Sequence, residues 1–415
     1  MTAPFSTQLK RCTTCLLPET HETLVLDSEG VCNICRAQEV KAEINWEERL
    51  VHLDKLVAEY RGNYRYDCLI PFSGGKDSTW TLYYLMNRYP GIKPLVVRFN
   101  HGFLRPNLRA NCDRVFRKLG VDVHDFSPSW KVVQRLMLQS FLEKGDFCWH
   151  CHTGIFAYPM QVAIKEQVPL IFWGEPSAEY TAYYNYDQAE EVDEERFNRY
   201  VNLGISAEDM LVRLDGYLDE RDVEPFRYPP LKELRQLGYR SVCLGSYIPW
   251  DVKMQVGKIR EELGWKGDLV ENVPEDFNYE KIECWMQGVR DYIKYIKRGY
   301  TRPTHLAAID LRNNRISKEE AKAMITQFEG RRPPSLDLFL DYVGLDEEQF
   351  YTIAMGHQVS PWQFDPDSIK SGPKTPDFED WLRGDGLDLV DAEDQLGRWA
   401  DSCSSCSSSS SCSGG

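Results

Sequence analysis

The stretch at residues 71–79, "PFSGGKDST", places two glycines, a lysine, an aspartate and hydroxyl side chains directly behind a short apolar run. Residues 66–72, "YDCLIPF", are typical of a buried strand, and residues 77–89 of a helix that Pro90 closes. Free backbone N–H groups and the positive end of a helix meet at such a turn. The stretch therefore predicts an anion site, although its spacing differs from the G-x-x-x-x-G-K-[ST] of the Walker A loop.

The side chains of this turn suit a nucleotide carrying a metal ion. Glycines let the backbone approach a phosphate, hydroxyls donate hydrogen bonds, and Lys76 adds a positive charge. Asp77 would repel a phosphate, so we interpret it as a ligand for Mg²⁺. The expected nucleotide contacts in the turn are Phe72, Ser73, Gly74, Gly75, Lys76, Asp77, Ser78 and Thr79.

Strand and helix patterns alternate on both sides of this turn. Further strands are predicted at residues 93–100, 121–127 and 168–175, and further helices at residues 107–120, 129–145 and 148–167. This alternation indicates an α/β fold with a parallel sheet covered by helices on both faces.

Four regions are predicted along the chain. Residues 1–45 are rich in cysteine, and 46–265 form the α/β domain, with an irregular, Tyr-rich and acidic insertion at about 176–240 that we interpret as a substrate-binding segment. Residues 266–395 are predicted to be helical, including one helix over 276–299. Residues 396–415, with "CSSCSSSSSCSGG" at their end, are expected to be disordered.

Composition narrows the class of protein. The 415 residues are 42% hydrophobic, enough for a substantial core, and the formal net charge is −15. This acidic balance argues against a passive nucleic-acid binder, so a nucleic-acid partner is not expected. No apolar run approaches the roughly 18 residues of a membrane span. We therefore expect a soluble, cytoplasmic protein whose cysteines are reduced.

Two Cys-x-x-Cys pairs near the N-terminus have the spacing of a metal site. Cys12 and Cys15 precede Cys32 and Cys35, and four thiolates can close a tetrahedral zinc site. An iron–sulfur cluster also uses four cysteines and stays open as an alternative. The segment has few apolar residues, so bound metal would supply its folding energy.

Another pair, Cys148 and Cys151, opens the helix predicted at residues 148–167. A helix N-terminus lowers the pKa of a thiol, so reactive cysteines are expected here.

The stretch "FSGGKDST" resembles the signature of the PP-loop, or N-type, ATP pyrophosphatases, and the resemblance covers about residues 65–260. It implies a Rossmann-like (adenine nucleotide alpha hydrolase-like) sheet and a reaction in which ATP adenylates an oxygen, pyrophosphate leaves and a nucleophile then displaces AMP. It also implies that adenine lies near the end of the second strand. The further nucleotide contacts are then Arg98, Phe99, Asn100, His101 and Gly174.

A narrower resemblance runs along most of the chain. The segments "RCTTCLLPET", "GVCNIC", "FCWHCHTGIF", "PLIFWGEPS", "YIPWD", "RPTHLAAIDLRNNRISKEEAKAMI" and "RRPPSLDLFLDYVGL" are similar to the N-acetyl sugar amidotransferase family of lipopolysaccharide and pseudaminic-acid-type sugar biosynthesis. This resemblance implies that an acetamido group becomes an acetamidino group. It also implies that a separate glutaminase subunit supplies the ammonia.

Several side chains fit that chemistry. Lys76 and a Mg²⁺ ion on Asp77 would disperse charge as the amide oxygen is adenylated. Glu175 follows the fourth strand, where ligands of parallel sheets bind, and is a second candidate ligand for metal or substrate. Lys253 would neutralise the α-phosphate or the leaving pyrophosphate, although an ordinary surface lysine is an equal interpretation.

Two alternatives stay open from the sequence. Sulfur-inserting relatives in the superfamily use a Cys-x-x-Cys pair and a distant cysteine to hold an iron–sulfur cluster, and Cys148, Cys151 and Cys243 would match that set. The second alternative is a zinc-stabilised scaffold, and the intact "SGGKDS" argues against it. The Gly-Gly end of the tail is most simply a flexible segment.

Overall fold

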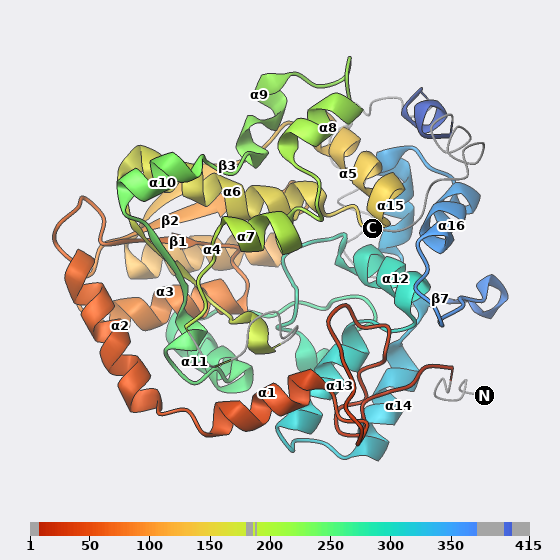
Figure 1. Ribbon diagram of the computed structural model, residues 1–415, viewed down its shortest axis with the longest axis horizontal. Coiled ribbons are helices and arrows are strands. Elements are labelled where there is room, and N and C mark those ends of the chain that lie inside the picture. Colours follow the sequence, from red (N-terminus) through yellow and green to blue (C-terminus); the bar gives the residue numbers. More distant parts are fainter. Residues whose placement is uncertain (1–7, 180–185, 187–188, 372–393, 401–415) are drawn as a thin grey trace.

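Five parallel strands form the centre of the molecule, in the order β3-β2-β1-β4-β5 (Figure 1). The computed structural model describes residues 8–179, 186, 189–371 and 394–400. The strands are β1 (Cys68–Pro71), β2 (Pro94–Phe99), β3 (Asp122–Phe126), β4 (Leu170–Trp173) and β5 (Arg240–Cys243). The first four lie within the strands predicted from the sequence, and the Rossmann-like α/β fold is confirmed. The fifth, β5, was not predicted.

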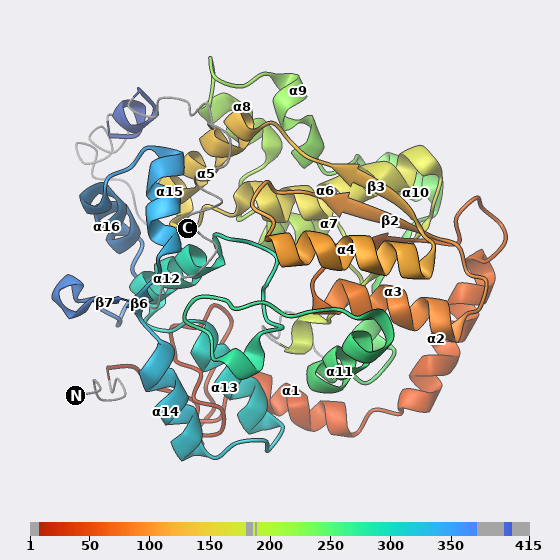
Figure 2. The same ribbon diagram turned by 180° about the vertical axis from the view of Figure 1, so that it is seen from behind.

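Helices cover both faces of this sheet. Helix α6 (Trp149–Glu166) lies on the face seen in Figure 1, and α3 (Lys76–Arg88) and α4 (Pro106–Leu119) lie on the face seen in Figure 2, with α11 (Val252–Leu263) packed on α3. Successive strand residues point to opposite faces. In β1, Leu69 therefore joins the core beneath α6, and Ile70 joins the core beneath α3 and α4.

The strand order places a crevice beside β1. The chain leaves β3 on one side of β1 and returns to β4 on the other, so the order reverses between β1 and β4. Ligands of open parallel sheets bind at the carboxyl ends of the strands at such a reversal. The turn at residues 71–79 follows β1, and Glu175 follows β4, so both lie at this edge.

The insertion at 176–240 folds back onto the sheet. An antiparallel bridge joins Glu191 to Val242, and the N–H of Cys243 donates to the carbonyl oxygen of Glu190 at 3.1 Å. Its helices are short: α7 (Glu194–Arg196), α8 (Ala207–Arg213), α9 (Glu220–Val223) and α10 (Leu231–Leu237).

The C-terminal region is built from five further helices and packs against α5 (Trp130–Lys144). They are α12 (Gln287–Arg298), α13 (Arg302–Arg312), α14 (Lys318–Phe328), α15 (Ser335–Val343) and α16 (Glu347–Gly356). Phe141 of α5 stacks on Phe350 and meets the edge of Phe339. The two-residue strands β6 (Arg331–Arg332) and β7 (Lys370–Ser371) pair beside these helices.

Two predictions for this half of the chain are wrong. The helix predicted over 276–299 begins only at Gln287, and residues 278–286 form turns that cover the sheet edge. Disorder was predicted from residue 396, but 394–400 are helical, and Trp399 packs against the C-terminal core. The rest of the tail, 401–415, lies outside the described residues.

The N-terminal region wraps around one end of the molecule through α1 (Asn33–Ala42) and α2 (Trp46–Tyr60). Asn45 caps α2, because its side chain accepts a hydrogen bond from the N–H of Glu48. Within the described part of the chain, every helix is too short or too polar to cross a lipid bilayer.

Candidate active site

The turn after β1 has a shape that only glycine permits at its centre. Gly74 has φ +88°, and a Cβ atom there would lie 2.5 Å from the Sγ of Cys112. The indole Nε1 of Trp265 donates a hydrogen bond to the carbonyl oxygen of Gly74 at 3.1 Å. Trp265 is buried, so the turn is supported from beneath by the segment that follows α11.

Helix α3 starts from this turn with its first N–H groups uncapped. Gly75 occupies the N-cap position, and no side chain there accepts a hydrogen bond from the first turn. Ser73 and Ser78 face each other across the turn with their Oγ atoms 3.3 Å apart. Uncapped N–H groups at the positive end of a helix form an anion site, so the local geometry agrees with the sequence prediction.

Lys76 is the buried cation of this site. Its Nζ lies 2.8 Å from Oδ2 of Asp77 and 3.0 Å from Oε1 of Glu280, and its side chain is 4% exposed. Burial alone would lower the pKa of Lys76, but three carboxylates outweigh burial and raise the pKa well above its ordinary value. They belong to Asp77, Glu280 and Glu175. Lys76 is therefore charged.

Asp77 keeps one carboxylate oxygen without a partner. Oδ2 accepts from Lys76, while the buried Oδ1 has no hydrogen-bond partner among the described residues. A buried oxygen of this kind is costly unless a ligand satisfies it. A divalent cation prefers carboxylate oxygens, so the donor that the structure offers fits Mg²⁺.

The segment 278–286 closes the site from above, and sequence reasoning missed it. A Cβ added to Gly75 would lie 1.9 Å from Oε1 of Glu283, which places that carboxylate directly over the turn. The buried residues Tyr279, Ile282 and Trp285 recur every third position and imitate a helix. Glu280 and Glu283 lie between these apolar positions, and they were the feature of the sequence that indicated a polar partner for this segment.

A cavity of about 320 Å³ opens beside the turn. Its walls come from the ends of β1 and β2, the first turn of α6, segment 278–286 and the first turn of α12. It brings together seven of the predicted site residues, namely Phe72, Ser73, Arg98, Phe99, His101, Cys148 and Cys151. The cavity therefore lies where the resemblance to PP-loop enzymes implies the nucleotide.

Two cavity residues have defined charge states. Burial lowers the pKa of His101 to about 3, so its ring is neutral, and its Nδ1 accepts a hydrogen bond from the N–H of Phe103 at 3.3 Å. Arg98 pairs with Asp125 of β3 at 2.7 Å.

The other predicted residues lie around the turn. Gly174 is close to α3, because a Cβ there would be 3.2 Å from the carbonyl oxygen of Asp77. Glu175 contributes to the high pKa of Lys76. Lys253 does not line the cavity; its Nζ pairs with Asp310 of α13 at 2.7 Å, so its role toward the phosphates stays a prediction.

The cysteines at the cavity differ from the predicted set. Cys284 lines the cavity together with Cys148 and Cys151, whereas Cys243 lies at the end of β5, with its Sγ 3.8 Å from Nη1 of Arg196. Cys243 does not line this cavity, and its grouping with Cys148 and Cys151 stays a prediction.

The prediction of a lowered thiol pKa at the start of α6 is wrong. Burial raises the pKa of Cys148 well above its usual value and the pKa of Cys284 to about 12. Desolvation outweighs the helix N-terminus at this position.

The four N-terminal cysteines form a compact cluster. The Sγ atoms of Cys12 and Cys35 are 3.8 Å apart, those of Cys15 and Cys32 are 3.6 Å apart, and all four lie within 4.8 Å of one another. A zinc–sulfur distance of about 2.3 Å in a tetrahedron separates the sulfurs by about 3.8 Å. In an iron–sulfur cluster the four cysteines are divided among two or four irons, which keeps at least some of their sulfurs farther apart. The cluster can hold a metal ion, and its spacing fits a single one.

One comparison with known protein families matches a part of the C-terminal region that contributes to the site. Residues 271–375 match the family model "LPS biosynthesis protein WbpG-like, C-terminal domain". This region is similar to the C-terminal domain of WbpG-like proteins. The match bears out the resemblance to the sugar amidotransferases of lipopolysaccharide biosynthesis, and the domain includes Glu280, Glu283 and Cys284. The matched region thus supplies Glu280 and Glu283 to the turn at residues 71–79.

No curated protein sequence matches the chain. Among solved structures, the chain is similar to the U34-tRNA thiolase NcsA from Methanococcus maripaludis with its [4Fe-4S] cluster. The identity is 16%, the match covers 61% of this chain and 80% of that chain, and the TM-score is 0.23.

Proposed function

We propose that the protein is an ATP-dependent, AMP-forming amidotransferase that converts the acetamido group of an N-acetyl sugar into an acetamidino group. The observation that carries the proposal is the charged, buried Lys76 beside Asp77 at the uncapped start of α3. The WbpG-like domain, which supplies Glu280 to the same site, supports a sugar acceptor.

The reaction balances in two steps. The amide oxygen of the acetamido group attacks the α-phosphorus of ATP, and pyrophosphate leaves with its electron pair. Ammonia then adds to the imidate carbon, and AMP departs with the former amide oxygen while the nitrogen loses a proton. An amide oxygen is a poor leaving group by itself, so adenylation supplies the activation that exchange by ammonia requires.

Residues of this chain have separate roles in those steps. Lys76 and the N–H groups at the start of α3 would hold and neutralise the phosphates. Asp77, with its unpartnered Oδ1, would hold Mg²⁺, which supplies charge neutralisation to the triphosphate when bound. The cavity bounded by Phe99 and His101 would hold adenine and exclude water from the activated intermediate.

The ammonia source and the other cofactors complete the proposal. We propose a separate glutaminase subunit as donor, an N-acetyl sugar as the small-molecule acceptor, and a cytoplasmic location where ATP is available. The four N-terminal cysteines would hold a structural Zn²⁺ ion, because their spacing fits one tetrahedral metal. Nucleic acid is not part of the proposal.

A direct assay tests the reaction class. The protein is incubated with ATP, Mg²⁺, a panel of N-acetyl sugars, and either ammonium or sulfide. AMP, pyrophosphate and product mass are then measured. Replacement of one oxygen by NH, with one AMP per product, supports the proposal. Production of ADP, or turnover that ignores every sugar, contradicts it.

A sulfurtransferase is the second candidate, and one observation favours it. Three cysteines, Cys148, Cys151 and Cys284, line the cavity that would hold the nucleotide. Three thiolates at one cavity could hold an iron–sulfur cluster or carry sulfur. Anaerobic purification separates the two candidates, because iron bound in the wild type and lost in Cys284→Ser favours sulfur transfer. A colourless wild-type protein with zinc alone favours amidation.

A further inference from the structure

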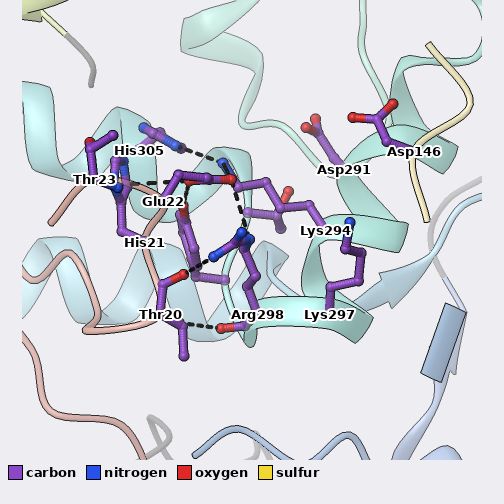
Figure 3. A network of polar contacts seen from close by, with 12 residues as sticks. Thr20, His21, Glu22, Thr23, Asp146, Asp291, Lys294, Lys297, Arg298 and His305 are labelled. Carbon is purple, nitrogen blue, oxygen red and sulfur yellow. Dashed lines mark hydrogen bonds and ion pairs between the residues drawn. The ribbon is translucent and has the colours of Figure 1, made fainter. Parts of the chain in front are cut away.

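A second cavity shares Arg290 with the first and is lined by more positive than negative side chains. It has a volume of about 120 Å³ and is bounded by α12, the start of α13, the turn after α5 and the N-terminal Glu22 (Figure 3). Its basic residues are Arg290, Lys294, Lys297, Arg298 and Arg302, and its acidic residues are Glu22, Asp146 and Asp291. The lining therefore has two more positive than negative charges, in a chain whose net charge is −15.

The acidic residues are already engaged. Glu22 takes contacts from Lys294 at 3.3 Å and Arg298 at 3.4 Å, and its other oxygen accepts from Tyr300. Asp146 lies 3.4 Å from Arg290. Asp291 lies 3.3 Å from Arg302, although its buried Oδ2 has no hydrogen-bond partner among the described residues. Each carboxylate of the lining is thus already paired with a basic side chain.

Lys297 is the cation with no carboxylate partner among the described residues. Its Nζ donates to the carbonyl oxygens of Lys144 at 2.6 Å and Gly145 at 3.1 Å, and these dipoles solvate the charge without neutralising it. Burial lowers the pKa of Lys297 most strongly. Asp146 and Glu22 counteract part of that shift, whereas the nearby positive charges of Arg298 and Arg290 add to it. A bound anion would relieve this crowding.

His305 also lines the cavity and contributes no charge at neutral pH. Burial lowers its pKa well below the usual value, and its Nε2 lies 3.2 Å from the Nζ of Lys294. The excess positive charge thus comes from lysine and arginine. It would repel ammonium or a divalent metal ion, so neither is a suitable occupant.

Arg290 connects this cavity to the site already described. It lines both cavities, and its buried Nε has no hydrogen-bond partner among the described residues. An anion in the second cavity would therefore lie across Arg290 from the nucleotide. The volume of about 120 Å³ is much smaller than the 320 Å³ of the first cavity, so this cavity suits a small oxyanion better than a whole nucleotide.

We infer that this second cavity is a binding site for a phosphoryl oxyanion, held by Lys297, Arg290 and their basic neighbours. Guanidinium and ammonium groups together are the donors that bind phosphate in proteins. The oxyanion can be a phosphate carried by the acceptor or free phosphate in solution. In the first case the site would orient the acceptor toward the nucleotide cavity. The inference goes beyond the proposed reaction, since binding here requires no particular chemistry.

Calorimetry on the full chain tests the site. The nucleotide cavity is first saturated with α,β-methylene ATP. The protein is then titrated with inorganic phosphate, N-acetylglucosamine 1-phosphate or unphosphorylated N-acetylglucosamine. Both phosphorylated probes are expected to bind, with affinity falling as salt rises. Lys297→Met is expected to weaken binding about tenfold, the loss typical of one charge-assisted hydrogen bond, whereas Lys297→Arg retains it.

The matched control is Lys258→Met, which removes a partly exposed lysine of α11 paired with Glu261 and Glu262. It should bind the probes as the wild type does. Tighter binding of the sugar phosphate assigns the site to the acceptor, and equal binding assigns it to free phosphate. Failure of both phosphorylated probes to bind overturns the inference, as does equal affinity in Lys297→Met.

The test is separate from that of the proposed function. Absence of AMP formation would refute the amidotransferase while leaving this site intact. Absence of phosphate binding would refute this site while leaving the amidotransferase proposal intact.

Discussion

The carboxylate of Glu280 lies 3.0 Å from the Nζ of Lys76, and both side chains are almost completely buried. Lys76 opens the helix after the first strand, whereas Glu280 lies in the region that is similar to the WbpG-like C-terminal domain. The turn at residues 71–79 is thus completed by a segment that lies far along the sequence. ATP would have to replace Glu280 as a partner of Lys76, which couples nucleotide binding to the position of segment 278–286.

Glu280→Gln tests this coupling. Removing one partner of a buried ion pair costs several kcal/mol, and because Asp77 stays beside Lys76 we expect a loss of about 2 kcal/mol in unfolding free energy. ATP would supply the missing negative charge, so the rise in melting temperature on adding α,β-methylene ATP should be larger in Glu280→Gln than in the wild type. The exposed Glu348→Gln on α16 is the control. An unchanged ATP-induced rise would show that Glu280 and the nucleotide do not compete.

Asp77→Asn should abolish formation of AMP and pyrophosphate while leaving the fold intact. The change removes the negative charge that would hold Mg²⁺ but keeps the size of the side chain. We expect turnover to fall at least about 100-fold, or about 2.7 kcal/mol in the activation free energy. Asp113→Asn on the exposed surface of α4 is the matched control. Wild-type turnover in Asp77→Asn would remove the basis for the ATP site.

Gly75→Ala separates two reasons for a glycine at this position. The added Cβ would lie 1.9 Å from Oε1 of Glu283, the end of a half-buried side chain that can turn away, so the variant should lose at most about 1 kcal/mol of stability through overpacking. The double variant Gly75→Ala/Glu283→Ala removes that overlap and should recover the melting temperature. AMP formation should remain low in the double variant, because the same Cβ would meet the phosphate. Recovered turnover would assign the glycine to packing against Glu283 alone.

The sequence predicted the part of the site that local patterns encode. The turn at residues 71–79 lies between a strand and a helix as expected, because apolar runs and helical periodicity are local signals. Segment 278–286 was missed because Tyr279, Ile282 and Trp285 are buried by tertiary contacts at a spacing that resembles a helix. The short strand β5 was missed because its four residues gain their pairing only beside β4.

The thiol predictions failed for a related reason. A helix N-terminus is visible in the sequence, but the desolvation that raises the pKa of Cys148 comes from residues that gather only on folding. The set of cysteines that lines the cavity is equally non-local, since Cys284, and not Cys243, lines it together with Cys148 and Cys151. In contrast, the cluster of Cys12, Cys15, Cys32 and Cys35 was predictable, because the spacing within each pair already brings two ligands together.

Cys12→Ser should release the metal ion and destabilise the N-terminal region. The metal would tie residues 12–35 to the core that includes Tyr300 and Ala308, so its loss removes folding energy that few apolar residues can replace. Metal analysis should find about one zinc per wild-type chain and none in the variant. Cys68→Ser provides the control for a buried cysteine outside the cluster: it should lower the melting temperature yet keep the metal. Unchanged metal content in Cys12→Ser would contradict the zinc site.

The neutral, buried His101 should make the protein sensitive to acid. Burial lowers its pKa to about 3, whereas an unfolded histidine titrates near 6.5, so between these values the unfolded chain binds one more proton than the folded chain. The contribution of His101 to stability is therefore complete above about pH 6.5 and falls by about 1.4 kcal/mol for each pH unit below it. Urea unfolding of the wild type and of His101→Gln from pH 7 to pH 4.5 should show this difference in slope, and the exposed His52→Gln should keep the wild-type slope. Parallel pH profiles for the wild type and His101→Gln would mean that the ring gains its proton without leaving its site.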